Sequence, residues 1–299
     1  MHEVYLYGMI LKSNSFLLQG NYPEPDSYGE IQKKYMLTGG ETGTAATVLA
    51  SLGCQIKIDG NHMGRNTYPL IKAFYEERNV DVSALYYDEN YEGLEDYILI
   101  DKATRTCFGT FNHYYSEAVK RWNKPNKKDI ADAKVVGLDP FFKEEAVQVA
   151  KWCDELDKPY VVIDCEYDNP MHKLATVNVI SNEFIRGKYK DLTREEIYKR
   201  YTEQAKGLVI LTLGAKEVMY GRKGEAPHFF KPYAVDVVST LGAGDTFKAG
   251  CVYAVLHQMK DDEIVSFASA CAGIACSKFP IPLNPPTLEE IHTLQQSRA

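Results

Sequence analysis

Short runs of apolar residues alternate with longer amphipathic segments along most of the chain. The apolar runs predict strands buried on both faces at residues 4–10, 55–60, 134–139, 160–166, 177–181 and 208–214. The amphipathic segments between them predict helices at residues 42–53, 67–78, 143–156 and 193–205. Because strands alternate with helices, the pattern predicts an α/β fold with a mostly parallel central sheet covered by helices on both faces.

Two stretches, residues 13–38 and 93–113, interrupt this alternation and lack a helical period. The second predicts two strands, Asp96–Ile100 and Thr106–Phe111, joined by a turn around Lys102–Thr104. The first ends in a strand-like alternation at Ile31, Lys33, Tyr35 and Leu37. We expect a small antiparallel sheet that stands off a main domain formed by residues 1–12, 39–92 and 114–299.

A sheet of this size would expose one apolar face, which must cover a site or pair with another subunit. The residues expected on that face are Phe16, Leu18, Tyr97, Leu99 and Phe108. The cheapest partner is a second copy related by a two-fold axis, so we expect a homodimer through this sheet.

Composition narrows the class of protein. The 299 residues are 45% apolar, enough for one large domain, or one large and one small. The formal net charge is −7 without a basic block, so nucleic acid is not an expected partner. No apolar run approaches the ~20 residues that span a bilayer. The start, MHEVYLYGMI, lacks a basic leader, and the seven cysteines form no CxxC pair, which favours reduced thiols in a cytoplasmic protein.

The stretch STLGAGDT, residues 239–246, combines two glycines with an aspartate before a helix. The preceding Ala234–Val238 predicts a strand, and the helix is indicated by Phe247, Cys251, Val255 and Met259, which recur every four residues. First-turn N–H groups have no intrahelical partner, so this element predicts an anion cradle for phosphates. Asp245 beside it could accept the proton of an attacking hydroxyl. The alternative is a tight turn capped by Asp.

A second glycine motif, GGETGTAATVLASLG at residues 39–53, opens one of the predicted helices. Its first two glycines would bring the backbone close to a polyol, although a helix start with a Gly C-cap explains the motif equally well when it stands alone. The P-loop motif, the full dinucleotide fingerprint and the protein-kinase motifs are absent from the sequence.

Together, the two motifs resemble the paired signatures of the PfkB family of carbohydrate kinases, which have the ribokinase-like fold. VILTLGAKEVMY (209–220) and PPTLEEI (285–291) extend the resemblance over essentially the whole chain, in family order. The resemblance implies ATP-dependent phosphorylation of a sugar hydroxyl with Mg²⁺, and a small β lid made by the two irregular stretches. It also implies the following roles: Asp245 as the base; Gly242, Ala243 and Gly244 as the anion hole; Gly39 and Gly40 as sugar contacts; and Thr212, Gly214, Thr240 and Ser269 at the nucleotide.

Two departures from the family concern cations. Ser239 stands where an Asp usually helps to hold a monovalent cation, and KFPIPLNPP (278–286) replaces the usual cation loop, so activation by K⁺ is not expected. Ile185 stands where the family's Asn-x-x-Glu motif has its acidic residue. Asp164 and Glu166, at the end of a predicted strand, are the candidates for holding Mg²⁺ through water.

Further departures concern the acceptor. The segment from Gly8 to Ser13 lacks the Asp that usually binds sugar hydroxyls, and Glu41 and Thr44 replace the Lys and Asn of ribokinases, so ribose is not an expected substrate. Ser13 and Thr44 are candidate substrate contacts. Lys12 is a candidate contact for an acidic or phosphorylated substrate, or a solvated lysine. Arg105 is a candidate to reach inward from the lid, or an exposed lid residue. The acceptor could be a sugar or a sugar acid, a nucleoside kinase is the main alternative, and a weakly catalytic metabolite-binding protein is a third.

Overall fold

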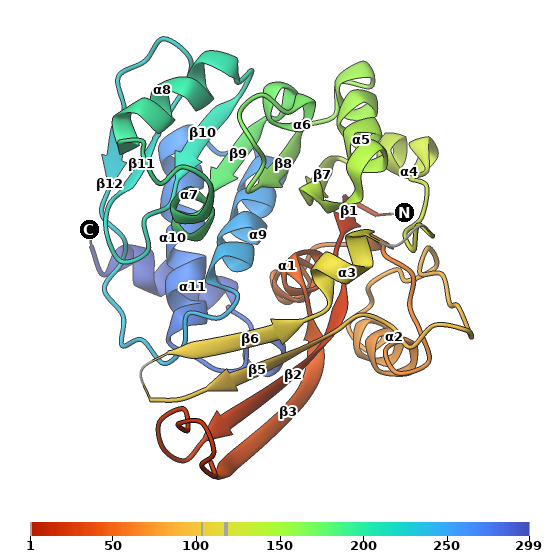
Figure 1. The fold of residues 1–299 in the computed structure, drawn as a ribbon. Helices are drawn as coiled ribbons and strands as arrows, with labels where there is room; N and C mark the ends of the chain where they lie inside the picture. Colours follow the sequence, from red (N-terminus) through yellow and green to blue (C-terminus); the bar gives the residue numbers. More distant parts are fainter. Residues whose placement is uncertain (1, 103, 117–118, 299) are drawn as a thin grey trace.

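The computed structural model describes residues 2–102, 104–116 and 119–298, and they form two sheets (Figure 1). The larger sheet has eight strands in the order β12-β11-β10-β9-β8-β7-β1-β4. Its strands are β1 (Val4–Gly8), β4 (Ile56–Gly60), β7 (Val135–Leu138), β8 (Tyr160–Ile163), β9 (Val177–Ile180), β10 (Leu208–Leu211), β11 (Val218–Gly221) and β12 (His228–Phe230). The six strands from β4 to β10 are parallel and the last two are antiparallel, which confirms the mostly parallel sheet.

Eleven α-helices are seen in the described residues. They are α1 (Glu41–Ser51), α2 (Tyr68–Glu76), α3 (Phe111–Ser116), α4 (Lys127–Asp132), α5 (Lys143–Glu155), α6 (Pro170–Leu174), α7 (Asn182–Lys188), α8 (Arg194–Gln204), α9 (Ala243–Leu256), α10 (Asp261–Cys276) and α11 (Leu288–Gln296). Two short 3₁₀ turns, Pro140–Phe142 and Ile281–Leu283, complete the set. None of the helices in these residues is long and apolar enough to cross a bilayer.

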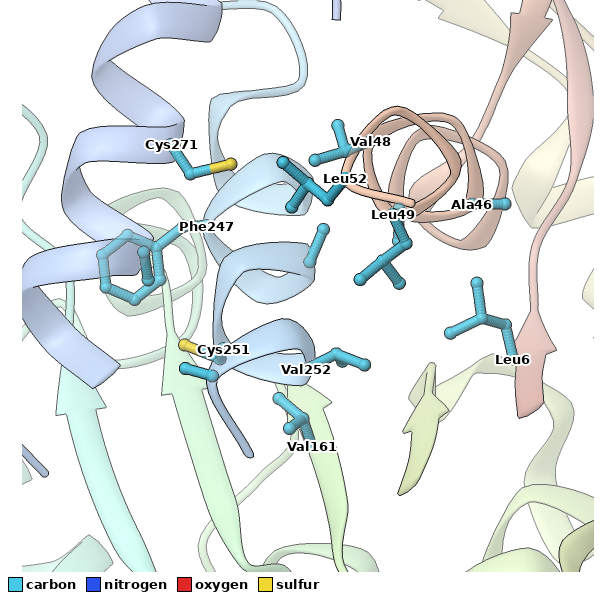
Figure 2. Packing of buried hydrophobic residues seen from close by; sticks show 14 of the residues in the cluster. Leu6, Ala46, Val48, Leu49, Leu52, Val161, Phe247, Cys251, Val252 and Cys271 are labelled. Carbon is cyan, nitrogen blue, oxygen red and sulfur yellow. The ribbon is translucent and has the colours of Figure 1, made fainter. Parts of the chain in front are cut away.

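Helices cover both faces of the large sheet because alternate residues of its strands are apolar on both sides. In β1, Val4 and Leu6 belong to the apolar cluster that β1 forms with α1, α9 and α10 on one face of the sheet. Figure 2 shows Leu6 on the side of α1 and α9, with α10 on the far side of α9. Tyr5 and Tyr7 point to the other face, which packs with α5 and α6. The helices α7 and α8 cover the same second face farther along, against Val209 and other residues.

The smaller sheet has four strands in the order β3-β2-β5-β6 and lies beyond one end of the large sheet (Figure 1). Its strands are β2 (Leu11–Leu18), β3 (Ile31–Gly39), β5 (Glu95–Ile100) and β6 (Arg105–Gly109). The prediction of an antiparallel sheet was wrong at its centre, where β2 and β5 run parallel. The pattern of single strands does not encode direction, and the long chain between these strands allows a parallel pairing.

Three further predictions need correction. Residues 231–238 form no strand, and Val237 and Val238 are about 60% exposed (61% and 64%). The strand expected up to Phe111 ends at Gly109, because α3 begins at Phe111. The helix after Asp245 ends at Leu256, before Met259. The turn expected around Lys102–Thr104 includes residue 103, which lies outside the described residues.

Candidate active site

A cavity of 170 Å³ lies between the four-stranded sheet and the first turns of α1 and α9. It is lined by the following predicted acceptor and anion-hole residues: Ser13, Gly39, Gly40, Thr44, Gly242 and Asp245. These residues come from three distant parts of the sequence, so the tertiary fold brings both glycine motifs to one place. A cavity below ~300 Å³ suits a small molecule of about sugar size.

Gly40 sets the entry to α1. Its φ is 84°, and a Cβ there would lie 2.6 Å from the carbonyl oxygen of Met9. That same carbonyl accepts the N–H groups of Thr42 and Gly43, at 3.0 and 3.2 Å. A side chain at position 40 would therefore separate the start of α1 from the first strand, and with it the cavity wall.

The start of α9 has the geometry of an anion cradle. Gly242 is in the left-handed region with φ 75°, and α9 begins at Ala243. The N–H groups of Gly244 and Asp245 belong to the first turn, where the helix itself offers no acceptor and the dipole is positive. An oxyanion placed at this end of the cavity would meet these donors.

Asp245 combines access to the cavity with a shifted acidity. Burial raises the pKa of Asp245 to about 7, the ammonium of Lys248 opposes this shift, and the charge of Asp139 adds to it. A carboxylate with a pKa near neutral is suited to accept a proton at physiological pH.

A second aspartate lies behind Asp245 in a sealed cluster that the sequence did not predict. Asp139 and Lys248 form an ion pair, and both side chains are 0% exposed. The other carboxylate oxygen of Asp139 accepts the Met9 N–H at 2.9 Å and the Thr42 hydroxyl at 2.7 Å. The available signals were a lysine three residues after Asp245 on one helix, and an aspartate that ends a buried strand.

Two further carboxylates line the cavity, and neither was predicted as a site residue. Glu41 is the first residue of α1, and burial, followed by the charge of Asp245, raises its pKa well above the usual range. Asp96 lies in β5, and burial raises its pKa to about 6 against the opposing effect of the Ser13 hydroxyl. Glu41 had already stood out in the sequence as a replacement of the lysine found in ribokinases.

Lys12 and Arg105, the two cationic residues predicted as substrate contacts, do not line the cavity. Lys12 pairs with Glu95 at 3.2 Å, on the opposite face of β2 from Ser13, because side chains alternate along a strand. Arg105 donates from Nη1 to Oγ1 of Thr240 at 2.7 Å. Arg105 thus connects the four-stranded sheet to the loop before α9.

The predicted metal residues have protein partners. The carboxylate of Asp164 accepts the N–H and the hydroxyl of Ser181, at 2.6 and 2.8 Å, and burial raises the pKa of Asp164 to about 6. Glu166 pairs with Lys188 at 2.6 Å. Within residues 2–102, 104–116 and 119–298, no three His, Cys, Asp or Glu side chains form a metal-binding group. Glu183, which the sequence left unassigned, has a side chain 90% exposed and lies 3.8 Å from Arg105.

The four predicted nucleotide residues occupy different settings. Thr212 and Gly214 follow β10, and the Thr212 N–H bonds to the carbonyl of Ile180 at 2.9 Å. Thr240 is exposed in the loop before α9, whereas Ser269 is buried within α10 with 5% of its surface exposed. The structure does not bring Ser269 to the cavity that holds Asp245.

The parallel sheet, the small sheet over a cavity, and an aspartate at a glycine-rich helix start define a ribokinase-like fold. The pfkB family carbohydrate kinase model matches residues 12–281, and the chain belongs to this family, whose carbohydrate kinases are phosphotransferases with hydroxyl acceptors. Among solved structures, the Arabidopsis thaliana ribokinase complexed with ribose and ATP has a TM-score of 0.82 at 17% identity and 99% coverage of each chain. The Methanocaldococcus jannaschii nucleoside kinase has a TM-score of 0.79 at 17% identity, again over 99% of each chain.

Curated relatives match in sequence over shorter or weaker stretches. The Haemophilus influenzae ribokinase is 39% identical over 82 residues, which are 27% of this chain and 26% of that protein. The chain thus matches only about a quarter of the length of this relative. The Clostridium botulinum 5-dehydro-2-deoxygluconokinase is 21% identical over 294 residues, covering 90% of this chain and 86% of that protein. The family model therefore defines the family, and these relatives do not define the acceptor.

Proposed function

We propose that this protein transfers the γ-phosphoryl group of ATP to a hydroxyl of a sugar or sugar derivative held in the cavity. The observation that carries the proposal is Asp245, which lines the cavity and also belongs to the first turn of α9. A hydroxyl in the cavity would therefore lie between a base and an anion cradle, which is the arrangement that in-line phosphoryl transfer requires.

In the proposed reaction, Asp245 accepts the proton of the acceptor hydroxyl while the hydroxyl oxygen forms a bond to the γ-phosphorus. The bond from that phosphorus to the β,γ-bridging oxygen breaks, and ADP leaves. Backbone N–H groups of Gly242, Gly244 and Asp245 stabilise the negative charge on the transferred group. The Ala243 N–H joins them once it leaves the Thr240 carbonyl, 3.3 Å away. Thr212, Gly214 and Thr240 line the nucleotide, with Ser269 supporting that region from α10.

Magnesium would be held through water near Asp164, and the residues present fit this role. Carboxylate oxygens are the donors that Mg²⁺ prefers, and one or two suffice when phosphates supply the rest. Glu183 acts electrostatically on both Asp164 and Asp245, whereas Glu166 is engaged by Lys188. Glu183 is therefore a better second carboxylate than Glu166. When bound, the ion would neutralise charge on the phosphates.

Residues 13–38 and 93–113 would act as a lid that excludes water from the cavity, so that ATP is not lost to hydrolysis. The contact between Arg105 and Thr240 supports this role, because it closes the small sheet onto the main body. Lys12, held by Glu95 on the far face, is then a structural residue of the lid.

The outer face of the lid supports a homodimer of this cytoplasmic enzyme. Met36, Tyr97 and Phe108 fall in one row across the sheet, and they are 58%, 46% and 48% exposed. Leu18, which the sequence placed on this face, is buried and adds no exposed surface to it. Light scattering at micromolar concentration should give twice the mass of the chain, and Tyr97→Lys should halve it. Phe229→Lys, at an exposed aromatic elsewhere, is the control and should not.

The activity is tested by measuring ADP release from ATP and Mg²⁺ with a panel of neutral sugars, amino sugars, sugar acids and nucleosides. The expected result is acceptor-dependent ADP release that Asp245→Asn abolishes. ADP release only with nucleosides would show that the acceptor is a nucleoside and not a sugar, with the same catalytic residues. No release with any acceptor above the Asp245→Asn background would count against a kinase and favour a metabolite-binding role.

A further inference from the structure

The charged groups of the cavity wall all have one sign. Glu41 from α1, Asp96 from β5 and Asp245 from α9 line the cavity. The described lining contains no lysine, arginine or histidine. An uncompensated carboxylate is costly to bury, and the raised pKa values of these three groups show that, without a ligand, protonation relieves that cost. A bound cation would relieve it in another way, by stabilising the ionised carboxylates.

The cations nearest in sequence to these carboxylates are engaged elsewhere. Lys248, one turn after Asp245, is paired with Asp139. Lys12 on the strand beside Asp96 is paired with Glu95 on the outer face. Arg105 reaches Thr240 and Glu183 outside the cavity. The protein therefore has cations close by and directs each of them away from this space.

Glu41 and Asp96, the two lining carboxylates other than the proposed base, have no cation on the described lining to balance their charge. The charge of Asp245 disfavours the ionised form of Glu41. Oδ1 of Asp96 is buried and makes no hydrogen bond in the described part of the chain. An ammonium group beside Glu41 would offset its repulsion by Asp245, and one within reach of Asp96 would satisfy the unpaired oxygen. A charge-assisted hydrogen bond is roughly twice as strong as a neutral one.

Aromatic side chains on the same lining are also suited to a cation. Tyr35 and Phe279 line the cavity in an edge-to-face pair, with ring centroids 5.5 Å apart, and Phe111 lies on the same lining. The ring of Tyr35 already attracts one ammonium, that of Lys33, 4.9 Å from the ring centroid. Aromatic faces attract ammonium groups, by about 0.5–2 kcal/mol depending on desolvation. Carboxylates together with aromatic rings form a common setting for ammonium recognition, whereas neither favours a ligand anion.

From these walls we infer that the acceptor is a sugar that carries an amino group, with Glu41 and Asp96 binding the ammonium while Asp245 serves the reacting hydroxyl. This inference rests on the proposed kinase function and specifies its substrate class. A sugar acid or a sugar phosphate would bring a fourth negative charge into the cavity and is disfavoured. A neutral sugar would leave Glu41 and Asp96 to be neutralised by protons, whereas an ammonium group would form ion pairs with them.

The test compares matched acceptors on the full-length enzyme with ATP and Mg²⁺ at pH 7. One series is glucosamine, its 3-amino isomer, glucose, gluconate and glucose 6-phosphate; the other is 1-amino-1-deoxyfructose, fructose and fructose 1-phosphate. In the series that is phosphorylated, kcat/KM for an amine should exceed that for the hydroxyl analogue by about tenfold or more, equivalent to ~1.4 kcal/mol. Equal or better use of the neutral sugar, the acid or the phosphate would overturn the inference and leave the kinase standing.

Two isosteric variants locate the effect. Glu41→Gln and Asp96→Asn should each lower the amine-to-hydroxyl ratio of kcat/KM at least about fivefold, because each removes one charge partner. Both kcat/KM values of each ratio are measured on the same preparation of the variant. A loss of folded enzyme lowers both values equally and leaves the ratio unchanged. Glu92→Gln, at an exposed carboxylate before β5, is the matched control and should keep the ratio. An unchanged ratio in both cavity variants would refute the inference.

Binding without catalysis separates the two proposals. Thermal unfolding of the wild-type protein is followed with each compound but without ATP. If the amines alone raise the Tm while no compound is phosphorylated, the ammonium-binding site stands, but the proposed function fails and with it the role of the amine as acceptor. If no amine raises the Tm more than its hydroxyl analogue and none is phosphorylated, both are wrong.

Discussion

Asp245 and Asp139 differ in their partners although both act on the same lysine, Lys248. Asp139 is 0% exposed and has a backbone N–H, a hydroxyl and an ammonium on its two oxygens. Asp245 faces the cavity, and the described residues contain no hydrogen bond to its carboxylate. Asp139, whose two oxygens are both hydrogen-bonded, connects the start of α1 to α9. Asp245 keeps its carboxylate available to accept a proton from a ligand.

The comparison shows how one helix can carry both a structural and a chemical carboxylate. Lys248 forms its ion pair with Asp139. Its positive charge also lowers the pKa of Asp245, against the effect of burial, which raises that pKa. A buried ion pair one turn behind the base therefore keeps the base partly ionised without occupying it. The following predictions separate the two roles, from the largest expected effect to the smallest.

Asp245→Asn should lower kcat by at least about 10²-fold, the usual contribution of a positioned base, and leave ATP binding nearly intact. The measurement is steady-state ADP release with a nucleotide-binding titration beside it. Asp191→Asn, at an exposed aspartate, is the matched control and should keep the wild-type kcat. A near-wild-type kcat in Asp245→Asn would show that this carboxylate is not the base.

Lys248→Met should destabilise the protein by about 3–5 kcal/mol, because it leaves the Asp139 carboxylate buried without its cation. Chemical denaturation gives the free energy of unfolding. Lys199→Met on the surface of α8 is the control, with an expected change within about 0.5 kcal/mol.

Adding Asp139→Asn to Lys248→Met should restore part of the lost stability, since the uncompensated charge is then gone. Simple additivity of the two single changes would mean that the two residues are not energetically coupled.

The pH profile should report Asp245 and not Asp139. Because the base must be ionised to accept a proton and burial raises its pKa to about 7, kcat/KM should increase as the pH rises to 7 and level off above it. Below that pH the loss should approach about tenfold per unit. The residual activity of Asp245→Asn should lack this step; a step retained in the variant would assign it to another group.

Exchanging Na⁺ for K⁺ should have the smallest effect. Ser239 replaces a carboxylate, its hydroxyl accepts the Leu241 N–H at 3.2 Å, and the nearby Cys276 carbonyl already accepts two N–H groups. A rise of about tenfold in kcat on adding K⁺, equivalent to ~1.4 kcal/mol of the barrier, would contradict this prediction. It would show that carbonyl groups alone form a cation site beside the anion cradle.

The hydrophobic periodicity of the sequence was enough to predict those strands and helices that depend mainly on neighbouring residues. The six parallel strands of the large sheet and the helices α1, α2, α5 and α8 were predicted to within a few residues, because burial on both faces and helical periodicity depend on neighbouring residues. The strands β11 and β12 and several shorter helices were not predicted from this periodicity. The predicted strand Ala234–Val238 failed because a run of valines satisfies a strand pattern even where no neighbouring strand pairs with it.

The glycine motifs and Asp245 were set by the sequence itself, since a left-handed Gly242 and a helix start need only adjacent residues to form. Tertiary structure alone decided what surrounds them. The partners Asp139 and Lys248 lie 109 residues apart, and Asp96 meets Asp245 only because β5 pairs in parallel with β2. Charges interact through space, so the sign of the cavity wall, and with it the substrate class we infer, exists only once the chain has folded.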